Sequence, residues 1–296
     1  MRAADVDWAT KQSTTYRVRH HYRYVYSAPV HDMKQRLVMV PPDRHTDQLL
    51  RSWSFDVRGV HGACDIDWST DAFGNRVCRV AAEHVDHAID FETSFVVVRE
   101  PAASSTEQVA PDVAQRLRSH TGLTAPDERI ERIARQIATR AASLEQQAEL
   151  AHDWAAQAIT YRSGVTGTQT PAAMALHLGH GVCQDYAHIM LSVLRCLGIA
   201  CRYVSGHLLG EGAPHAWVEV LLEAQHPRDY AVVAYDPTHH RRAGTTYITV
   251  AVGRDFADVT MTSGVFSGAA SGRLHWSKHA EVVDAGTATE MREAAA

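Results

Sequence analysis

The sequence lacks the cysteine spacing of a metal ribbon or of a dithiol redox site. Its five cysteines are an odd number and form no C-x-x-C pair, which leaves a zinc ribbon or thioredoxin-type site unsupported. It also lacks a long basic run, and its formal net charge is −5, so nucleic acid and anionic membranes are poor candidates for partners. No apolar stretch is long enough to span a membrane.

The first eight residues have no apolar core of the kind found in a signal peptide, so we expect a cytoplasmic protein with reduced thiols. The composition, 45% hydrophobic and 21% charged over 296 residues, is typical of one large globular domain or two ordinary ones. The 19 histidines are scattered, with pairs at His20 and His21 and at His239 and His240. Composition alone therefore indicates no metal site, and we expect no cofactor.

The first third of the chain has the alternating pattern of β-strands. In the stretch from Tyr16 to Tyr26, tyrosines and valines fall on one face and arginines on the other, which predicts a strand with one half-buried face. A small-residue link follows at Pro101. We therefore predict a β-rich domain over residues 14–100, a catalytic domain over residues 101–284, and a disordered tail at residues 285–296.

Helical patterns replace strands after the link. Ser143 and Gln146 form a capping-box pattern, and the helix that follows is expected to carry Trp154 and Tyr161. Beyond Gly198, short strand-like segments alternate with turns, which predicts antiparallel pairing. The predicted fold class is therefore α+β.

Cys183 is the residue around which the second domain is organised. Gly179 and Gly181 precede it, and the apolar run that it opens predicts a buried helix ending at Gly198. The positive end of a helix dipole stabilises a thiolate at the N-terminus. Cys183 is therefore a candidate nucleophile.

A cysteine nucleophile needs a base and a group that orients the base. His215 begins one predicted strand and Asp236 ends the next, so the two side chains can lie side by side if these strands are neighbours. The backbone N–H of Cys183 is the expected first donor to an oxyanion. The expected second donor to the oxyanion is Tyr161 or Trp154. Trp217 is expected to border the cleft.

Four segments carry a resemblance to a known family: Gly181–His188, Arg202–Gly206, His215–Val220 and Tyr235–Thr238. They resemble the core of the bacterial transglutaminase-like superfamily, and residues 14–100 are similar to the β-rich domain that precedes this core in one bacterial subgroup. The resemblance implies a papain-like core, in which a nucleophile helix packs on an antiparallel sheet.

The resemblance also implies roles: Cys183 as nucleophile, His215 as base and Asp236 as orienting carboxylate, in acyl transfer from an amide to water or to an amine. It implies no calcium requirement, and the sequence shows no acidic calcium loop. One departure is His207, where the family pattern leads us to expect an aromatic residue. Its ring could touch the cleft or lie on the surface.

Simpler roles remain for the other reactive side chains. We expect the remaining cysteines to be structural and Asp185 to support the first turn of the Cys183 helix. For most histidines apart from His215 we expect solvated or core positions; these include His180, His188, His207 and His239.

Three functions stay open. The first is hydrolysis of peptide or isopeptide amides through a thioester, the second is transfer of the acyl group to an amine, and the third is a non-catalytic peptide-binding module on the same scaffold. A zinc site is a distant fourth. The expected partner is a peptide or protein amide substrate.

Overall fold

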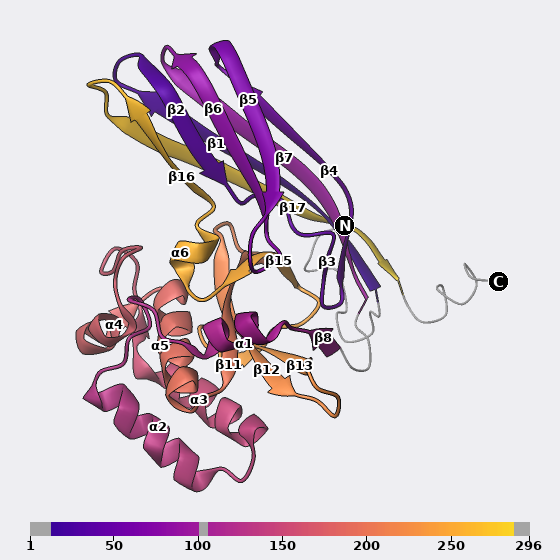
Figure 1. The fold of residues 1–296 in the computed structure, drawn as a ribbon, viewed down its shortest axis with the longest axis vertical. Helices are drawn as coiled ribbons and strands as arrows, with labels where there is room; N and C mark the ends of the chain where they lie inside the picture. Colours follow the sequence, from indigo (N-terminus) through magenta and orange to yellow (C-terminus); the bar gives the residue numbers. More distant parts are fainter. Residues whose placement is uncertain (1–12, 101–105, 287–296) are drawn as a thin grey trace, which may run out of the picture.

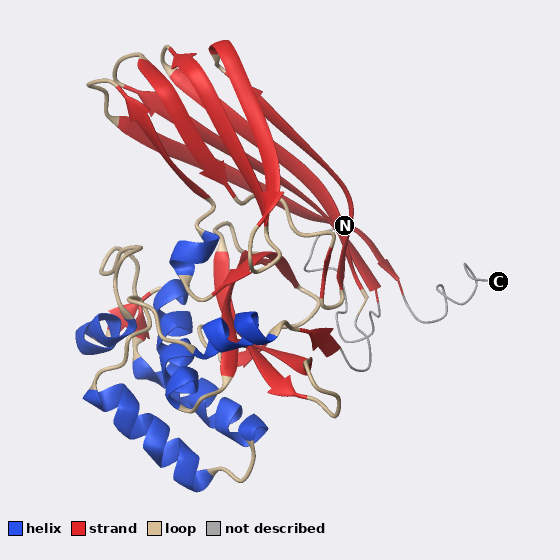
Figure 2. Ribbon diagram, viewed as in Figure 1, coloured by secondary structure: helices blue, strands red, loops and turns tan. Residues whose placement is uncertain are grey.

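The computed structural model describes residues 13–100 and 106–286, and Figure 1 shows its course. Long strands fill one end of the molecule, and the helices gather at the other end around a second sheet (Figure 2). The predicted α+β class, with a β-rich region ahead of a mixed core, is confirmed.

Two antiparallel sheets make up the β-rich end. A five-stranded sheet has the order β17-β1-β7-β4-β3, and a four-stranded sheet has the order β16-β2-β6-β5. Buried residues of both sheets, such as Met33 and Phe91, share one hydrophobic cluster between them. The strands are β1 (Ser13–Tyr26), β2 (Val30–Leu37), β3 (Arg44–His45), β4 (Gln48–Arg58), β5 (His61–Thr70), β6 (Arg76–Val85), β7 (Ala88–Arg99), β16 (Thr262–Ser267) and β17 (Gly272–Gly286).

The alternation in β1 decides which face is buried. Tyr16, Val18 and Tyr22 are buried, whereas Arg19 and Arg23 between them are exposed. Successive side chains of a strand point to opposite faces, so one sequence pattern fixes both faces. The predicted half-buried tyrosine face is confirmed.

The last two strands belong to the β-rich end. β16 pairs with β2, and β17 pairs with β1 along its whole length. Sequence analysis grouped residues 262–284 with the catalytic domain, and the pairing corrects that grouping, because these residues complete the edges of the two N-terminal sheets. Of the expected tail at residues 285–296, β17 includes the first two residues, and residues 287–296 lie outside the described part of the chain.

The second region packs helices against an antiparallel sheet of order β14-β13-β12-β11-β15, with β8 pairing beside β13. A short parallel pair, β9 with β10, lies apart. The sheet strands are β8 (Thr106–Gln108), β11 (Ala200–Leu208), β12 (His215–Glu223), β13 (Asp229–Asp236), β14 (Arg241–Arg242) and β15 (Tyr247–Gly253), and the pair is β9 (Thr160–Tyr161) and β10 (His180–Gly181).

The helices surround α5, which contacts α2, α3 and α4 as well as β11 and β12. Its buried position fits the run from Ile189 to Leu194, which is apolar apart from Ser192. Within the described residues, no helix is long and apolar enough to cross a membrane. The helices are α1 (Pro111–Arg118), α2 (Glu128–Arg140), α3 (Leu144–Ala158), α4 (Ala172–Leu178), α5 (Cys183–Cys196) and α6 (Phe256–Val259).

Side-chain amides join the two regions. Gln48 makes two hydrogen bonds to the backbone of Thr249, at 2.8 and 2.9 Å. Asn75 makes two to the backbone of Val252, each at 2.7 Å. Thr249 and Val252 each donate one of these bonds and accept the other. Both lie on β15, an edge strand of the second sheet, so the β-rich region satisfies backbone groups that an edge would leave unpaired.

Candidate active site

Two glycines and a carboxylate shape the approach to Cys183. Gly179 ends α4 with a φ of 68°, a left-handed conformation that favours glycine. A Cβ on Gly181 would lie 2.6 Å from the Asp185 side chain, so only glycine fits there. Asp185 accepts a hydrogen bond from the backbone N–H of Val182 at 2.7 Å, which confirms its expected role as helix support.

Cys183 is the first residue of α5, as the sequence predicted. Its side chain is partly exposed and packs against the edge of the main hydrophobic core. The first backbone N–H groups of a helix have no acceptor within the helix, so the N–H of Cys183 is available to a ligand. The sulfur thus lies at a rigid helix end that solvent can reach.

Strand pairing brings His215 and Asp236 together. β12 and β13 are antiparallel neighbours, and the start of one lies beside the end of the other. The Nε2 of His215 lies 2.8 Å from Oδ2 of Asp236, and both side chains are buried. The Cys183 thiol lies near enough to raise the pKa of His215, and Nδ1 is the ring nitrogen that Asp236 leaves free. The structure therefore brings all three expected catalytic residues into one group.

The charges of this group favour an imidazolium. Burial alone lowers the pKa of His215, but hydrogen bonds and charges from Asp236 and Cys183 outweigh burial and raise that pKa to about 10. Burial alone raises the pKa of Asp236, but its hydrogen bond to His215 and the charge there hold that pKa well below its ordinary value. Asp236 is therefore a carboxylate beside a protonated ring over the neutral pH range.

Asp236 accepts more hydrogen bonds than the sequence indicated. The Tyr247 hydroxyl donates to Oδ2 at 2.7 Å, and His239 Nδ1 lies 2.8 Å from the same oxygen. Oδ1 accepts from the backbone N–H of Thr238 and of His239, at 2.9 and 3.2 Å. Sequence analysis placed His239 among solvated or core residues and did not consider Tyr247. The spacing of His239, three residues after Asp236 in one turn, is the signal that could have found it.

A second carboxylate, Glu211, faces the same histidines. Its oxygens lie 3.5 Å from His215 Nδ1 and 3.0 Å from His239 Nε2. These three side chains present atoms within 4.8 Å of one another, a spacing that a metal ion could use. The Lys278 ammonium on β17 donates to the backbone carbonyls of Glu211 and Ala213, at 2.8 and 3.0 Å. The β-rich region thereby holds the loop that leads into His215.

The expected cleft residues differ in their positions. Tyr161 is 57% exposed and lies in β9 beside Gly181; its pKa is raised by burial and by the neighbouring charges of Cys183 and Glu211. Its expected helical position is wrong, because α3 ends at Ala158 and the chain turns extended to pair with β10. Trp154 packs against the main core.

Trp217 shares the strand face of His215, as the alternation predicted. It is only 1% exposed, and its ring stacks on His215 with a centroid separation of 6.2 Å. It also packs edge-on against Tyr247. Trp217 therefore supports the histidine from behind as a core residue.

His207 is neither a surface ring nor a cleft residue. It is buried, and its Nε2 lies 2.7 Å from Nε2 of His20 on β1. Burial lowers the pKa of His20 to about 3, so this pair is neutral and joins the two regions. Among the cysteines expected to be structural, Cys78 and Cys201 are buried, whereas Cys64 is exposed.

Tyr247→Phe is expected to lower the free energy of unfolding by about 1.5–3 kcal/mol, because it removes a buried donor to the Asp236 carboxylate. Chemical denaturation measures the change. Tyr235→Phe is the matched control, since the Tyr235 hydroxyl is buried and has no hydrogen-bond partner among the described residues. Equal losses in the two variants would show that the Tyr247 hydroxyl does not support Asp236.

Two family models match the chain. Residues 131–237 match the transglutaminase-like superfamily, and residues 16–98 match the bacterial transglutaminase-like N-terminal region. The first match contains all three residues of the candidate site, and the second contains most of the β-rich end. The sequence-based recognition of this family is confirmed.

Curated proteins of mycobacteria are similar to part of this chain. An uncharacterized protein of Mycobacterium leprae is 40% identical over 125 residues, which are 39% of this chain and 42% of that protein. An uncharacterized protein of Mycobacterium tuberculosis is 38% identical over 117 residues, 36% of this chain and 37% of that protein. The matches thus span about two fifths of these relatives.

The crystal structure of a candidate cysteine protease from Cytophaga hutchinsonii has a TM-score of 0.73 to this chain at 18% identity, and covers 92% of this chain and 91% of its own. At this identity the likeness shows a shared fold, over both regions. The chain therefore belongs to the transglutaminase-like superfamily, with the bacterial transglutaminase-like N-terminal region ahead of the core.

Proposed function

We propose that the chain is a cysteine hydrolase of peptide or isopeptide amide bonds, with Cys183 as nucleophile, His215 as acid and base, and Asp236 as orienting carboxylate. The observation that carries the proposal is the ordered contact of the three groups. His215 has Nε2 on the Asp236 carboxylate at 2.8 Å, and the Cys183 thiol lies near enough to raise the pKa of the His215 ring. Such a chain of contacts defines a nucleophile, its base and its orienter.

The reaction follows from these contacts. His215 holds the proton as an imidazolium beside the Cys183 thiolate, and the thiolate attacks the amide carbonyl to form a C–S bond. The backbone N–H of Cys183 donates to the oxyanion, with the exposed Tyr161 hydroxyl beside it as the proposed second donor. The C–N bond then breaks as His215 protonates the leaving amine, which leaves a thioester on Cys183.

Deacylation uses the same groups in reverse. His215 takes a proton from water, the water oxygen attacks the thioester, and the C–S bond breaks to give a carboxylic acid and the free thiol. Throughout, Asp236 stabilises the imidazolium form of His215 and keeps the ring in place. Two polar residues beside Cys183 and His215 favour water as the acceptor of the acyl group, because Tyr161 is exposed and Glu211 is about one-third exposed. A polar surface that is open to solvent does not exclude water from a thioester.

The test is a screen of peptides and isopeptides in the presence of a labelled primary amine. We expect release of carboxylic acid and amine, and loss of this release after iodoacetamide treatment. Cys64→Ser protein is the suitable sample, since Cys64 is exposed and competes for the reagent. Hydrolysis that survives complete alkylation of Cys183 would remove the proposal.

The other outcomes separate the remaining functions. Labelled amide in place of acid would identify an acyltransferase of the transglutaminase type. Saturable peptide binding without turnover would identify a non-catalytic module. A cytoplasmic location, which keeps the Cys183 thiol reduced, remains part of the proposal.

A further inference from the structure

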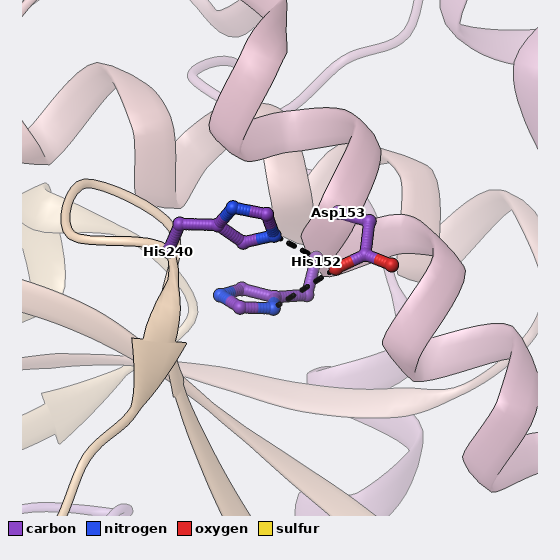
Figure 3. A group of neighbouring side chains, drawn as sticks. All are labelled: His152, Asp153 and His240. Atoms are coloured by element: carbon purple, nitrogen blue, oxygen red, sulfur yellow. Dashed lines mark hydrogen bonds and ion pairs between the residues drawn. The ribbon is translucent and has the colours of Figure 1, made fainter.

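A cluster of two histidines and one aspartate joins α3 to the turn that follows β13. His152 and Asp153 come from α3, and His240 comes from the turn after β13 (Figure 3). Asp153 Oδ1 lies 2.8 Å from His240 Nε2 and 3.8 Å from His152 Nδ1. The three ligand atoms all lie within 4.8 Å of one another.

We propose that His152, Asp153 and His240 form a binding site for a divalent transition metal ion of the Zn²⁺ type. Two imidazole nitrogens and one carboxylate oxygen are ligands that Zn²⁺ prefers, and water can complete a tetrahedron. Zinc–ligand bonds of about 2.0–2.2 Å place ligand atoms roughly 3.3–3.6 Å apart in a tetrahedron. The present separations bracket this value, so an ion needs only small side-chain movements.

His152 is prepared as a ligand by its surroundings. Its ring is buried, so packing holds the ring in one orientation. Its Nε2 lies 3.2 Å from the backbone carbonyl oxygen of Asp236. A proton on Nε2 is needed for that hydrogen bond, which leaves the lone pair of Nδ1 directed toward Asp153. Metal-binding histidines commonly have their other nitrogen bound to a carbonyl in this way.

His240 has an unusual backbone conformation and a side-chain contact with Asp153. Its φ is 50°, in the left-handed region that residues other than glycine rarely adopt. Asp153 and His240 are both half exposed, so solvent and ions can reach the site. The ligand set is therefore assembled before an ion arrives and open to its entry.

An ion at this site would fasten α3 to the turn that follows β13. Asp236, the last residue of β13, contacts His215, and His239 in that turn contacts Glu211. Coordination at His152 Nδ1 would also fix the proton on Nε2, which the Asp236 carbonyl accepts. The site would thus stabilise the backbone of the orienting carboxylate. It stands on its own contacts and does not depend on the proposed hydrolysis.

The second group of possible ligands, Glu211 with His215 and His239, has to be separated from this one. It includes the candidate base and lies beside the Cys183 thiol. A metal bound there would block Cys183 and His215, and it would not link α3 to the turn that follows β13. Glu211→Gln removes one of its ligands and leaves His152, Asp153 and His240 unchanged.

The experiment uses the full chain with Cys183→Ala, freed of metal by chelation, so that the catalytic thiol cannot bind the ion. Zn²⁺ titration by calorimetry is expected to give one equivalent, and Co²⁺ is expected to give the visible absorption of a tetrahedral complex. The unfolding temperature should rise by about 5 °C at a Zn²⁺ concentration 100-fold above Kd.

The deciding variant is Asp153→Asn with His240→Ala, in which both changed residues are exposed and folding is not at risk. We expect its Kd for Zn²⁺ to rise by about 100-fold or more, and the thermal shift to vanish. His177→Ala, an exposed histidine on α4, is the matched control and should bind as the parent does.

Three results would overturn the proposal. The first is no saturable Zn²⁺ binding by the parent chain. The second is unchanged affinity in the Asp153→Asn, His240→Ala variant. The third is a loss of the bound equivalent with Glu211→Gln, which would assign the ion to the catalytic group.

Discussion

Cys183→Ala is expected to lower kcat/KM for amide hydrolysis by about 10⁵-fold or more, because the variant has no atom that can form the thioester. The group acts as a unit, so its loss is not made up by the histidine. The fold should survive, since the sulfur is partly exposed at the edge of the core. Initial rates on the responsive substrate, together with circular dichroism, measure both properties.

The matched control for this variant is Cys196→Ala. Cys196 is the last residue of the same helix, and its side chain is also partly exposed. It lies at the opposite end of α5 from Cys183, so its removal should change kcat/KM little. Activity in Cys183→Ala above about 1% of the parent value would contradict the thioester mechanism.

Asp236→Asn is expected to lower kcat by about 10⁴-fold, as loss of an orienting aspartate does in a hydrolytic triad. The reason lies in the pKa of His215. Without the carboxylate, burial dominates and the imidazolium is lost at lower pH. The alkaline limb of the kcat/KM profile should therefore move down from about pH 10.

Stability should change with pH in the same variant. The raised pKa of His215 stabilises the parent fold fully below about pH 6.5, and this contribution is lost as pH rises toward about 10. The depressed pKa of Asp236 contributes above about pH 3.8 and is lost as pH falls. The His215–Asp236 pair therefore stabilises the fold most between about pH 3.8 and pH 6.5. In Asp236→Asn, the free energy of unfolding should change less with pH.

Asp236→Ala tests the structural share of this residue. It leaves Tyr247, His239 and two backbone N–H groups without their acceptor, and we expect a loss of about 3–5 kcal/mol in the free energy of unfolding. Asp229→Asn, at the other end of β13, is the control for charge loss on the same strand. An unchanged alkaline limb and kcat in Asp236→Asn would show that Asp236 does not orient His215.

The elements around the candidate site could be predicted because their signals are local. Glycines before Cys183 and an apolar run after it define a helix start. The strand that begins with His215 and the strand that ends with Asp236 are consecutive, so antiparallel pairing places these residues together. Helix support by Asp185 follows from its place in the first turn.

The parts that could not be predicted depend on contacts between distant segments. Glu211 is positioned by Lys278, whose own position depends on the pairing of β17 with β1. Tyr161 leaves the helix because β10, nearly twenty residues later, offers a partner strand. Trp217 has the alternation of a cleft residue, but the packing of Tyr247 against it decides its burial. No local pattern carries such information.

The pairing of β17 with β1 has a consequence for biosynthesis. The second sheet is complete at Gly253, the end of β15, so it can form while the last strands are still on the ribosome. β1 and β2 leave the ribosome first, but each lacks its outer partner until residues 262–286 emerge. Until β16 and β17 are synthesised, the open edges of β1 and β2 can pair with strands of other chains. The domain that is made first is therefore the last to close.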